Sequence, residues 1–142
     1  RLDGTSDLGL DVKLAPEFPA IQFYGYTKSE RRVMDWLKGP RGNRHYTFSR
    51  SAGNWDACQR VLEAGGNVAV VSMAPRPETF SGFPTVDGDA HDFRFLDPPG
   101  TVVWLKAKGT KAMLADGLES GFILPGSENP DSTIRFTLKI AA

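Results

Sequence analysis

The chain has 142 residues, a length typical of one domain that can bury a sizeable core. Its 17 lysine and arginine residues balance its 17 aspartate and glutamate residues, so net charge provides no bulk attraction to nucleic acid or to a membrane surface. One cysteine, Cys58, excludes an intramolecular disulfide and an all-cysteine metal site, and no apolar run approaches the roughly 18 residues of a membrane span. We therefore expect a cytoplasmic protein without a membrane partner, and nucleic-acid binding is not indicated.

Residues 1–7 are rich in aspartate, serine and threonine, and they read as the end of a strand followed by a polar turn. The first residue is Arg1 rather than methionine. We expect residues 1–142 to form a single domain that is the carboxyl-terminal part of a longer protein.

Strands and helices alternate through the first half of the chain. Aromatic and β-branched residues predict strands over 21–28, 44–51 and 67–73, the last of them apolar without alternation. Apolar residues at helical spacing predict a helix that begins after Ser29 and a second helix, capped by Asn54, that runs to residue 64. This alternation is typical of a parallel sheet covered by helices.

The segment 87–109 combines the densest polar cluster with the strongest apolar run. We predict a strand over 93–96, a type II turn in Asp97-Pro98-Pro99-Gly100, and a strand over 101–105 that is buried on both faces. The preceding segment 74–86 is rich in proline and glycine, and we predict a long loop that is functional or mobile.

After Gly109, Thr110 is expected to cap a short helix over 111–115, and residues 121–124 are expected to form a short strand. Residues 133–140 alternate between apolar and polar side chains, which predicts a half-exposed strand that is antiparallel or at an edge. The predicted fold class is therefore α/β. It is a partial (half) βα barrel or an open, mostly parallel sheet, with an antiparallel strand added at the carboxyl terminus.

Several predicted strands end in polar residues. The carboxyl ends of parallel strands share one edge of a sheet, where α/β folds bind their ligands. A cationic pocket for phosphate or carboxylate is one hypothesis, with a phosphorylated or nucleoside small molecule as its partner. The alternative is that charged strand ends simply reach solvent. The candidate ligand-binding residues are Lys28, Ser49, Arg50, Lys106 and Lys108.

Acidic residues provide two further candidate sites, and the cofactor stays open. Carboxylates beside an imidazole suit a divalent metal, although Asp-Gly-Asp is also common in solvated turns. Asp3 and Asp7 are candidate catalytic residues as an acid–base pair, or they cap the following segment. The candidate metal ligands are Asp87, Asp89, His91 and Asp92.

Several segments together resemble a family of uncharacterised proteins common in phages and environmental sequences. They are RLDGTSDL (1–8), IQFYGYTKS (21–29), YTFSRS with a following NW (46–55), NVAVV (67–71), and the stretch 87–109 with RFLDPPG and LKAKG. The resemblance implies a cysteine-rich amino-terminal half similar to radical-SAM βα barrels, with this chain as the carboxyl-terminal half. The cysteine cluster is absent here, so we expect no iron–sulfur site within this chain.

Three functions follow as hypotheses. The first is the substrate-binding half of a radical-SAM-like enzyme, with its anion pocket at the carboxyl edge of the strands. The second is a non-catalytic accessory or binding protein of phage type that contacts a partner through residues 74–86. The third is a metal-dependent hydrolase. Because a half barrel leaves open sheet edges that invite pairing, we also expect a homodimer or an amino-terminal partner segment.

Overall fold

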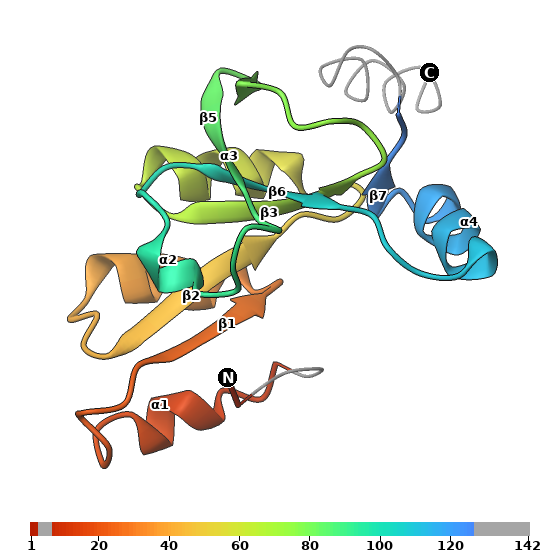
Figure 1. Ribbon diagram of the computed structural model, residues 1–142. Helices are drawn as coiled ribbons and strands as arrows, with labels where there is room; N and C mark the ends of the chain where they lie inside the picture. Colours follow the sequence, from red (N-terminus) through yellow and green to blue (C-terminus); the bar gives the residue numbers. More distant parts are fainter. Residues whose placement is uncertain (3–6, 127–142) are drawn as a thin grey trace.

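The computed structural model describes residues 1–2 and 7–126 (Figure 1). Within these residues the fold is built on a seven-stranded sheet. The strands lie in the order β1-β2-β3-β6-β5-β4, and β7 pairs with β3. The strands are β1 (Phe23–Thr27), β2 (Arg44–Ser49), β3 (Asn67–Ser72), β4 (Thr79–Phe80), β5 (Phe83–Asp87), β6 (Val102–Lys106) and β7 (Ile123–Leu124). The helices are α1 (Leu10–Leu14), α2 (Glu30–Lys38), α3 (Trp55–Glu63), the 3-10 helix η1 (Arg94–Leu96) and α4 (Lys111–Glu119).

The sheet is open and mostly parallel, which confirms the predicted α/β class and excludes a closed barrel. β1, β2, β3, β6 and β5 all pair in parallel, and β7 joins β3 in the same direction. The antiparallel pair is formed by β4 and β5. The predicted antiparallel strand over 133–140 lies outside the described residues.

Local sequence signals set the ends of the first two long helices. The Ser29 side chain accepts a hydrogen bond from the Arg32 N–H (3.3 Å), and α2 ends at Gly39, as predicted. Asn54 precedes α3 but makes no cap hydrogen bond. Its side chain instead accepts from the Ser51 N–H (2.8 Å) and donates to the Ser49 carbonyl (3.1 Å), so it ties the β2–α3 loop together.

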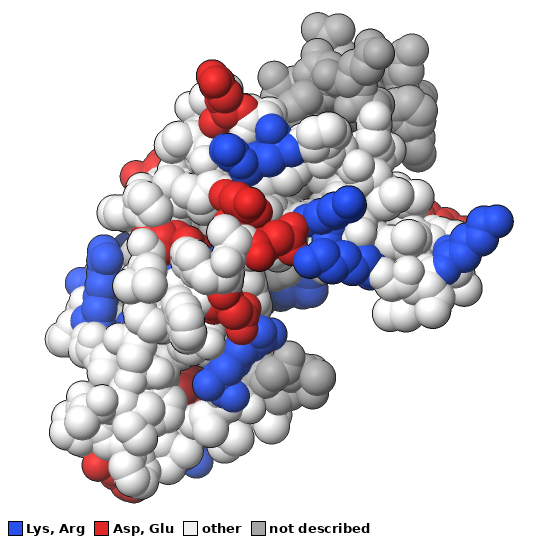
Figure 2. Space-filling view, viewed as in Figure 1, with Lys and Arg blue, Asp and Glu red and all other residues white. Residues whose placement is uncertain are grey.

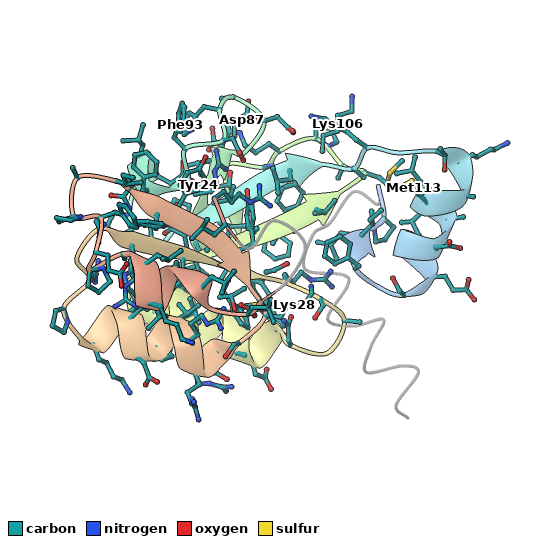
Figure 3. The ribbon with its side chains drawn as sticks, turned by 90° about the horizontal axis from the view of Figure 1, so that it is seen from below. Tyr24, Lys28, Asp87, Phe93, Lys106 and Met113 are labelled. Atoms are coloured by element: carbon teal, nitrogen blue, oxygen red, sulfur yellow. The ribbon has the colours of Figure 1, made fainter. Side chains whose placement is uncertain are left out.

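Both helices cover one face of the sheet and enclose the main core (Figures 1 and 3). Side chains such as Val33 of α2 and Val61 of α3 are fully buried against the strands. Burial of one such side chain stabilises the fold by about 1.5–3 kcal/mol. Most of the buried side chains that the sheet contributes to this core come from β2, β3 and β6, namely Tyr46, Phe48, Val68, Val70, Val102 and Trp104.

The segment between β5 and β6 lies on the opposite face, and the strand predicted over 93–96 is wrong. Residues 94–96 form η1, whose Arg94 side chain is fully buried and lies 3.3 Å from the Asp97 carboxylate. Phe95 packs edge-on against Tyr24 of β1, with ring centroids 5.3 Å apart. Gly100 has a φ of 73°, as the predicted turn requires. The alternation of Phe93 and Phe95 reflects packing of this covering segment rather than a strand.

The long loop predicted over 74–86 is also wrong, because β4 and β5 form a hairpin there. The two turn residues, Ser81 and Gly82, have φ values of 50° and 84°, as tight two-residue hairpin turns demand. Phe80 is buried against Trp55 and Trp104, with ring centroids 5.0 and 5.4 Å away. The hairpin thus extends the core and places β5 beside β6.

The helix and the short strand predicted after Gly109 are confirmed in place, the helix longer and the strand shorter than predicted. The Thr110 side chain accepts a hydrogen bond from the Met113 N–H (3.3 Å) and caps α4, which is nine residues long rather than five. β7 follows at 123–124. In the part of the chain that the structure describes, no helix has the length and apolar character needed to cross a membrane.

Candidate functional site

The carboxyl edge of the parallel strands carries most of the predicted site residues, but the structure separates them into two groups. The first, which we call the β1–β2 group, consists of Lys28, Ser49 and Arg50. The second, the β5–β6 group, consists of Asp87, Asp89, Lys106 and Lys108. Lys28 and Lys106 project from separate parts of the molecule (Figure 3), and three strand spacings correspond to roughly 14 Å. One pocket containing all five predicted cationic and hydroxyl residues is therefore not formed.

The β1–β2 group is held together by contacts with the chain just before β7. The Lys28 ammonium donates to Ser49 Oγ (3.3 Å) and stands 4.8 Å from the centroid of the Phe122 ring. Arg50 is 9% exposed, and its Nη1 donates to the carbonyl oxygens of Gly121 (2.8 Å) and Phe122 (3.2 Å). β7 pairs with the end of β3, beyond the point where β2 stops pairing. Arg50 thus fixes this return of the chain at the carboxyl edge.

Within residues 1–2 and 7–126, the two positive charges of the β1–β2 group have no carboxylate partner. Burial lowers the pKa of Lys28, and the adjacent Arg50 charge lowers it further. Burial likewise lowers the pKa of Arg50. Among the described residues, no Asp or Glu forms an ion pair with either side chain. An anion bound between them would relieve their mutual repulsion and part of the desolvation cost.

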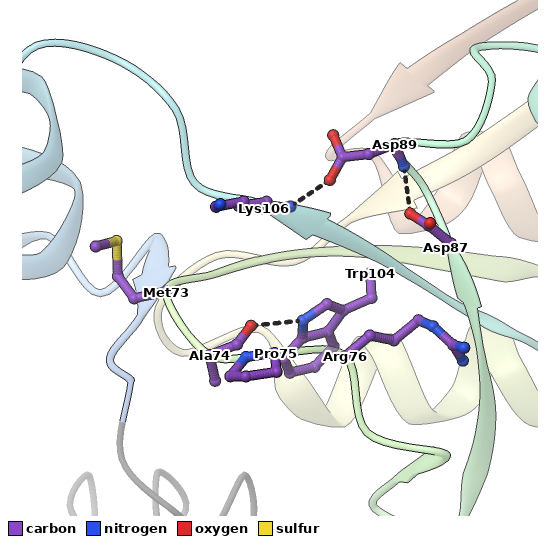
Figure 4. A pocket seen from close by; sticks show the side chains of 8 residues that line it. All are labelled: Met73, Ala74, Pro75, Arg76, Asp87, Asp89, Trp104 and Lys106. Atoms are coloured by element: carbon purple, nitrogen blue, oxygen red, sulfur yellow. Dashed lines mark hydrogen bonds between the residues drawn. The ribbon is translucent and has the colours of Figure 1, made fainter.

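Three members of the β5–β6 group, Asp87, Asp89 and Lys106, line a pocket of about 360 Å³ at the carboxyl ends of β3, β5 and β6 (Figure 4). Asp89 accepts hydrogen bonds from the Lys108 ammonium (2.7 Å) and the Lys106 backbone N–H (2.8 Å), which hold its pKa below the ordinary range. The Asp87 carboxylate accepts from the Asp89 N–H (2.9 Å). On the pocket floor, the indole nitrogen of Trp104 donates to the Ala74 carbonyl (3.1 Å).

The cationic side chains of this pocket point in different directions. In Figure 4 the Lys106 side chain extends toward Met73, whereas Arg76 extends toward β5, where its Nη1 donates to Thr85 Oγ1 (3.1 Å). Asp87 and Asp89 lie on the pocket wall between these directions. Basic and acidic side chains also alternate across the middle of this face (Figure 2). The pocket is therefore mixed in charge and suits a polar ligand better than a simple anion.

The four predicted metal ligands do not form a common site. His91 Nδ1 accepts from the Phe93 N–H (3.2 Å), and Asp92 forms an ion pair with Arg1 (3.7 Å), whereas Asp87 ends β5 and Asp89 lies in the turn that follows it. Over residues 1–2 and 7–126, no three His, Cys, Asp or Glu side chains are grouped so that they could hold a metal ion. The extended geometry that would align Asp87, Asp89 and His91 is absent because β5 ends at Asp87.

Of the predicted acid–base pair, the structure describes Asp7, whereas Asp3 lies outside the described residues. Asp7 accepts a hydrogen bond from Thr27 Oγ1 (2.5 Å) and forms an ion pair with Arg32 of α2. These contacts attach the amino-terminal segment to the end of β1. A catalytic role for Asp3 and Asp7 stays a prediction.

The sequence matches the family described as gene product 88 over residues 1–125. The chain belongs to the gene product 88 family. No curated protein and no solved structure matches it. Membership of the gene product 88 family supports the resemblance to uncharacterised proteins of phage type, and it does not show a radical-SAM barrel.

Sequence reasoning missed two contributors to the carboxyl edge of this gene product 88 protein. Phe122 covers Lys28 and accepts from Arg50, and Arg76 lines the pocket of Figure 4. The proline- and glycine-rich composition around Arg76 concealed the hairpin that positions it. No spacing in the sequence relates Phe122 to β1, since β7 reaches this edge through the α4 crossover.

Proposed function

We propose that this gene product 88 protein binds a small anionic ligand, a phosphorylated small molecule, at the β1–β2 group. The observation that carries the proposal is that Lys28, which donates to Ser49 Oγ, and the nearby Arg50 have no carboxylate partner among the described residues. Charge-assisted hydrogen bonds from lysine and arginine to phosphate oxygens are among the stronger polar contacts in proteins.

The surrounding fold adds to the positive potential at this point. α2 begins two residues after Lys28, and α3 begins at Trp55, five residues after Arg50. Both helices therefore start at the carboxyl edge, where the partial positive charge of a helix amino terminus favours an anion. Glu30, in the first turn of α2, is paired with Arg60 rather than with the cations of the group. The phosphate of the ligand would act as the anionic partner of Lys28 and Arg50.

The proposal assigns binding to this chain and no reaction step. A substrate-binding half of a radical-SAM-like enzyme would need such a site, but the iron–sulfur cluster of that chemistry has no ligand set here. Cys58 is the single cysteine, and burial raises its pKa to about 12, which keeps the thiol protonated. A binding protein of phage type without catalysis needs the same site and no additional residue.

Calorimetric titration of the full chain with inorganic phosphate and with ribose 5-phosphate tests the proposal. The variant Lys28→Met should weaken phosphate binding by about 10- to 100-fold, because it removes one charge-assisted hydrogen bond worth about 1.5–3 kcal/mol. Lys38→Met is the matched control, since it removes the same charge in the last turn of α2, at the other end of the helix from Lys28. Unchanged affinity in Lys28→Met, or an equal loss in both variants, would contradict the proposed site.

A further inference from the structure

A second hollow lies at the opposite edge of the sheet, where β2 and β3 begin. Its volume is about 170 Å³, and it is enclosed by the end of α2, the turn before β3 and the segment around η1. One ordered water needs only about 10–15 Å³ of such space, so the hollow has room for a one- or two-ring heterocycle. Strands of this length place it roughly 16–20 Å from the carboxyl edge, which makes it independent of the β1–β2 group.

Two aromatic side chains wall this amino-edge pocket, and both are held in place. The Trp36 indole nitrogen donates to the Arg44 carbonyl (3.0 Å). Phe95 packs against Tyr24, as described above. The Arg41 guanidinium stands 5.2 Å from the centroid of the Trp36 ring. Fixed aromatic walls of this kind favour a flat ring over a flexible chain.

Polar side chains in the wall have hydrogen-bonding capacity left over. The Asp97 side chain is 4% exposed, and its Oδ2 makes no hydrogen bond, although Arg94 Nε lies 3.3 Å away. His45 Nδ1 is also without a partner. Asn67 accepts from the Thr101 N–H (3.2 Å) through Oδ1, and its amide nitrogen donates to no described residue. Buried polar atoms without partners are rare in folded proteins, so Asp97 Oδ2 and His45 Nδ1 point to a ligand that donates hydrogen bonds.

We propose that the amino-edge pocket binds a planar heterocycle whose edge carries adjacent N–H donors, as guanine does. The Asp97 carboxylate has the two oxygens that such an edge requires, and His45 is neutral at pH 7 and supplies a further acceptor. Arg41 and the Asn67 amide are the donors for a ring carbonyl. A ring without adjacent donors would leave Asp97 Oδ2 without a hydrogen bond, with the Arg94 ion pair as its one charged contact on this side.

The chain contains two histidines, which makes nuclear magnetic resonance a direct test. In protein labelled with ¹⁵N-histidine, guanosine should shift the ring signals of His45, which lines the pocket, with His91→Gln assigning the two rings. Guanosine should bind at least tenfold more tightly than inosine, which lacks the exocyclic amine, and uridine should bind weakest. Equal binding of the three nucleosides, or shifts confined to His91, would overturn the proposal.

A second variant links the specificity to the carboxylate. Asp97→Asn should reduce the preference for guanosine over inosine by about tenfold. A folded Asp97→Asn protein that keeps the full preference would also overturn the proposal. If that variant does not fold, the comparison of guanosine with inosine in the unaltered protein still decides, because there the donor is removed from the ligand. Guanosine has no phosphate, so this outcome is separate from that of the anion site.

Discussion

His45 should make the stability of the fold depend on pH between about 4 and 6.5. Its ring is partly buried, and this burial, together with the charges of Arg41 and Arg94, lowers its pKa from 6.5 to about 4. As pH falls, His45 is therefore protonated near pH 6.5 in the unfolded chain but only near pH 4 in the folded chain. Stability from this group is fully present above pH 6.5 and is lost as pH falls. By linkage the loss is about 2 kcal/mol at pH 5 and about 3 kcal/mol at pH 4.

Urea unfolding at about pH 7.5 and about pH 5 measures this term. His45→Gln removes the titrating ring. Between these two pH values the free energy of unfolding should therefore decrease by about 2 kcal/mol less in His45→Gln than in the unaltered protein. His91→Gln is the control, because it makes the same substitution at the other histidine and leaves the His45 ring in place, so the loss attributed to His45 should persist in it. Identical pH dependence in the unaltered protein and in His45→Gln would refute the reasoning.

Two substitutions test the packing of the segment that follows β5. A Cβ at Gly88 would lie 2.6 Å from Leu105 Cδ2, so Gly88→Ala should destabilise the protein by about 1–3 kcal/mol in urea unfolding. Gly25→Ala meets no atom within 4 Å and should not share this loss. Arg94→Met leaves the buried Asp97 carboxylate without its partner and should cost about 3–5 kcal/mol at neutral pH, with partial recovery in acid, where that carboxyl is protonated. A loss that does not shrink in acid would argue against the ion pair.

The first half of the fold follows from local sequence. Ser29 caps a helix whose apolar face is legible in the spacing of Val33 and Trp36, and the apolar run of β3 predicts a central strand. Such signals depend on near neighbours in the chain, which is why the order of β1, α2, β2, α3 and β3 was predictable. The open parallel sheet follows from their alternation.

The remaining elements depend on contacts between distant residues. The hairpin turn at Ser81 and Gly82 is hidden among prolines, and its stability comes from Phe80 in the core rather than from strand propensity. The segment before Asp97 has the aromatic alternation of a strand, but the ion pair between Arg94 and Asp97 joins residues three apart in a tight helical turn. Neither contact is visible in a pattern of polar and apolar residues.

The candidate site likewise combines features that local sequence predicts with features that depend on contacts between distant residues. Parallel topology correctly predicts that Lys28, Ser49 and Lys106 lie at one edge, yet it does not give their separation along that edge. The order of the strands places β3 between the two groups, and that order comes from the late crossovers to β6 and β7. The expected homodimer or amino-terminal partner segment stays a prediction.

The position of a bound anion is the most direct test of the central claim. A crystal of the full chain soaked with tungstate, a heavy analogue of phosphate, would locate the ion by its anomalous scattering. The account predicts a peak within hydrogen-bonding distance of Lys28 and Arg50. A peak beside Lys106 and Lys108 with none at the β1–β2 group would contradict it.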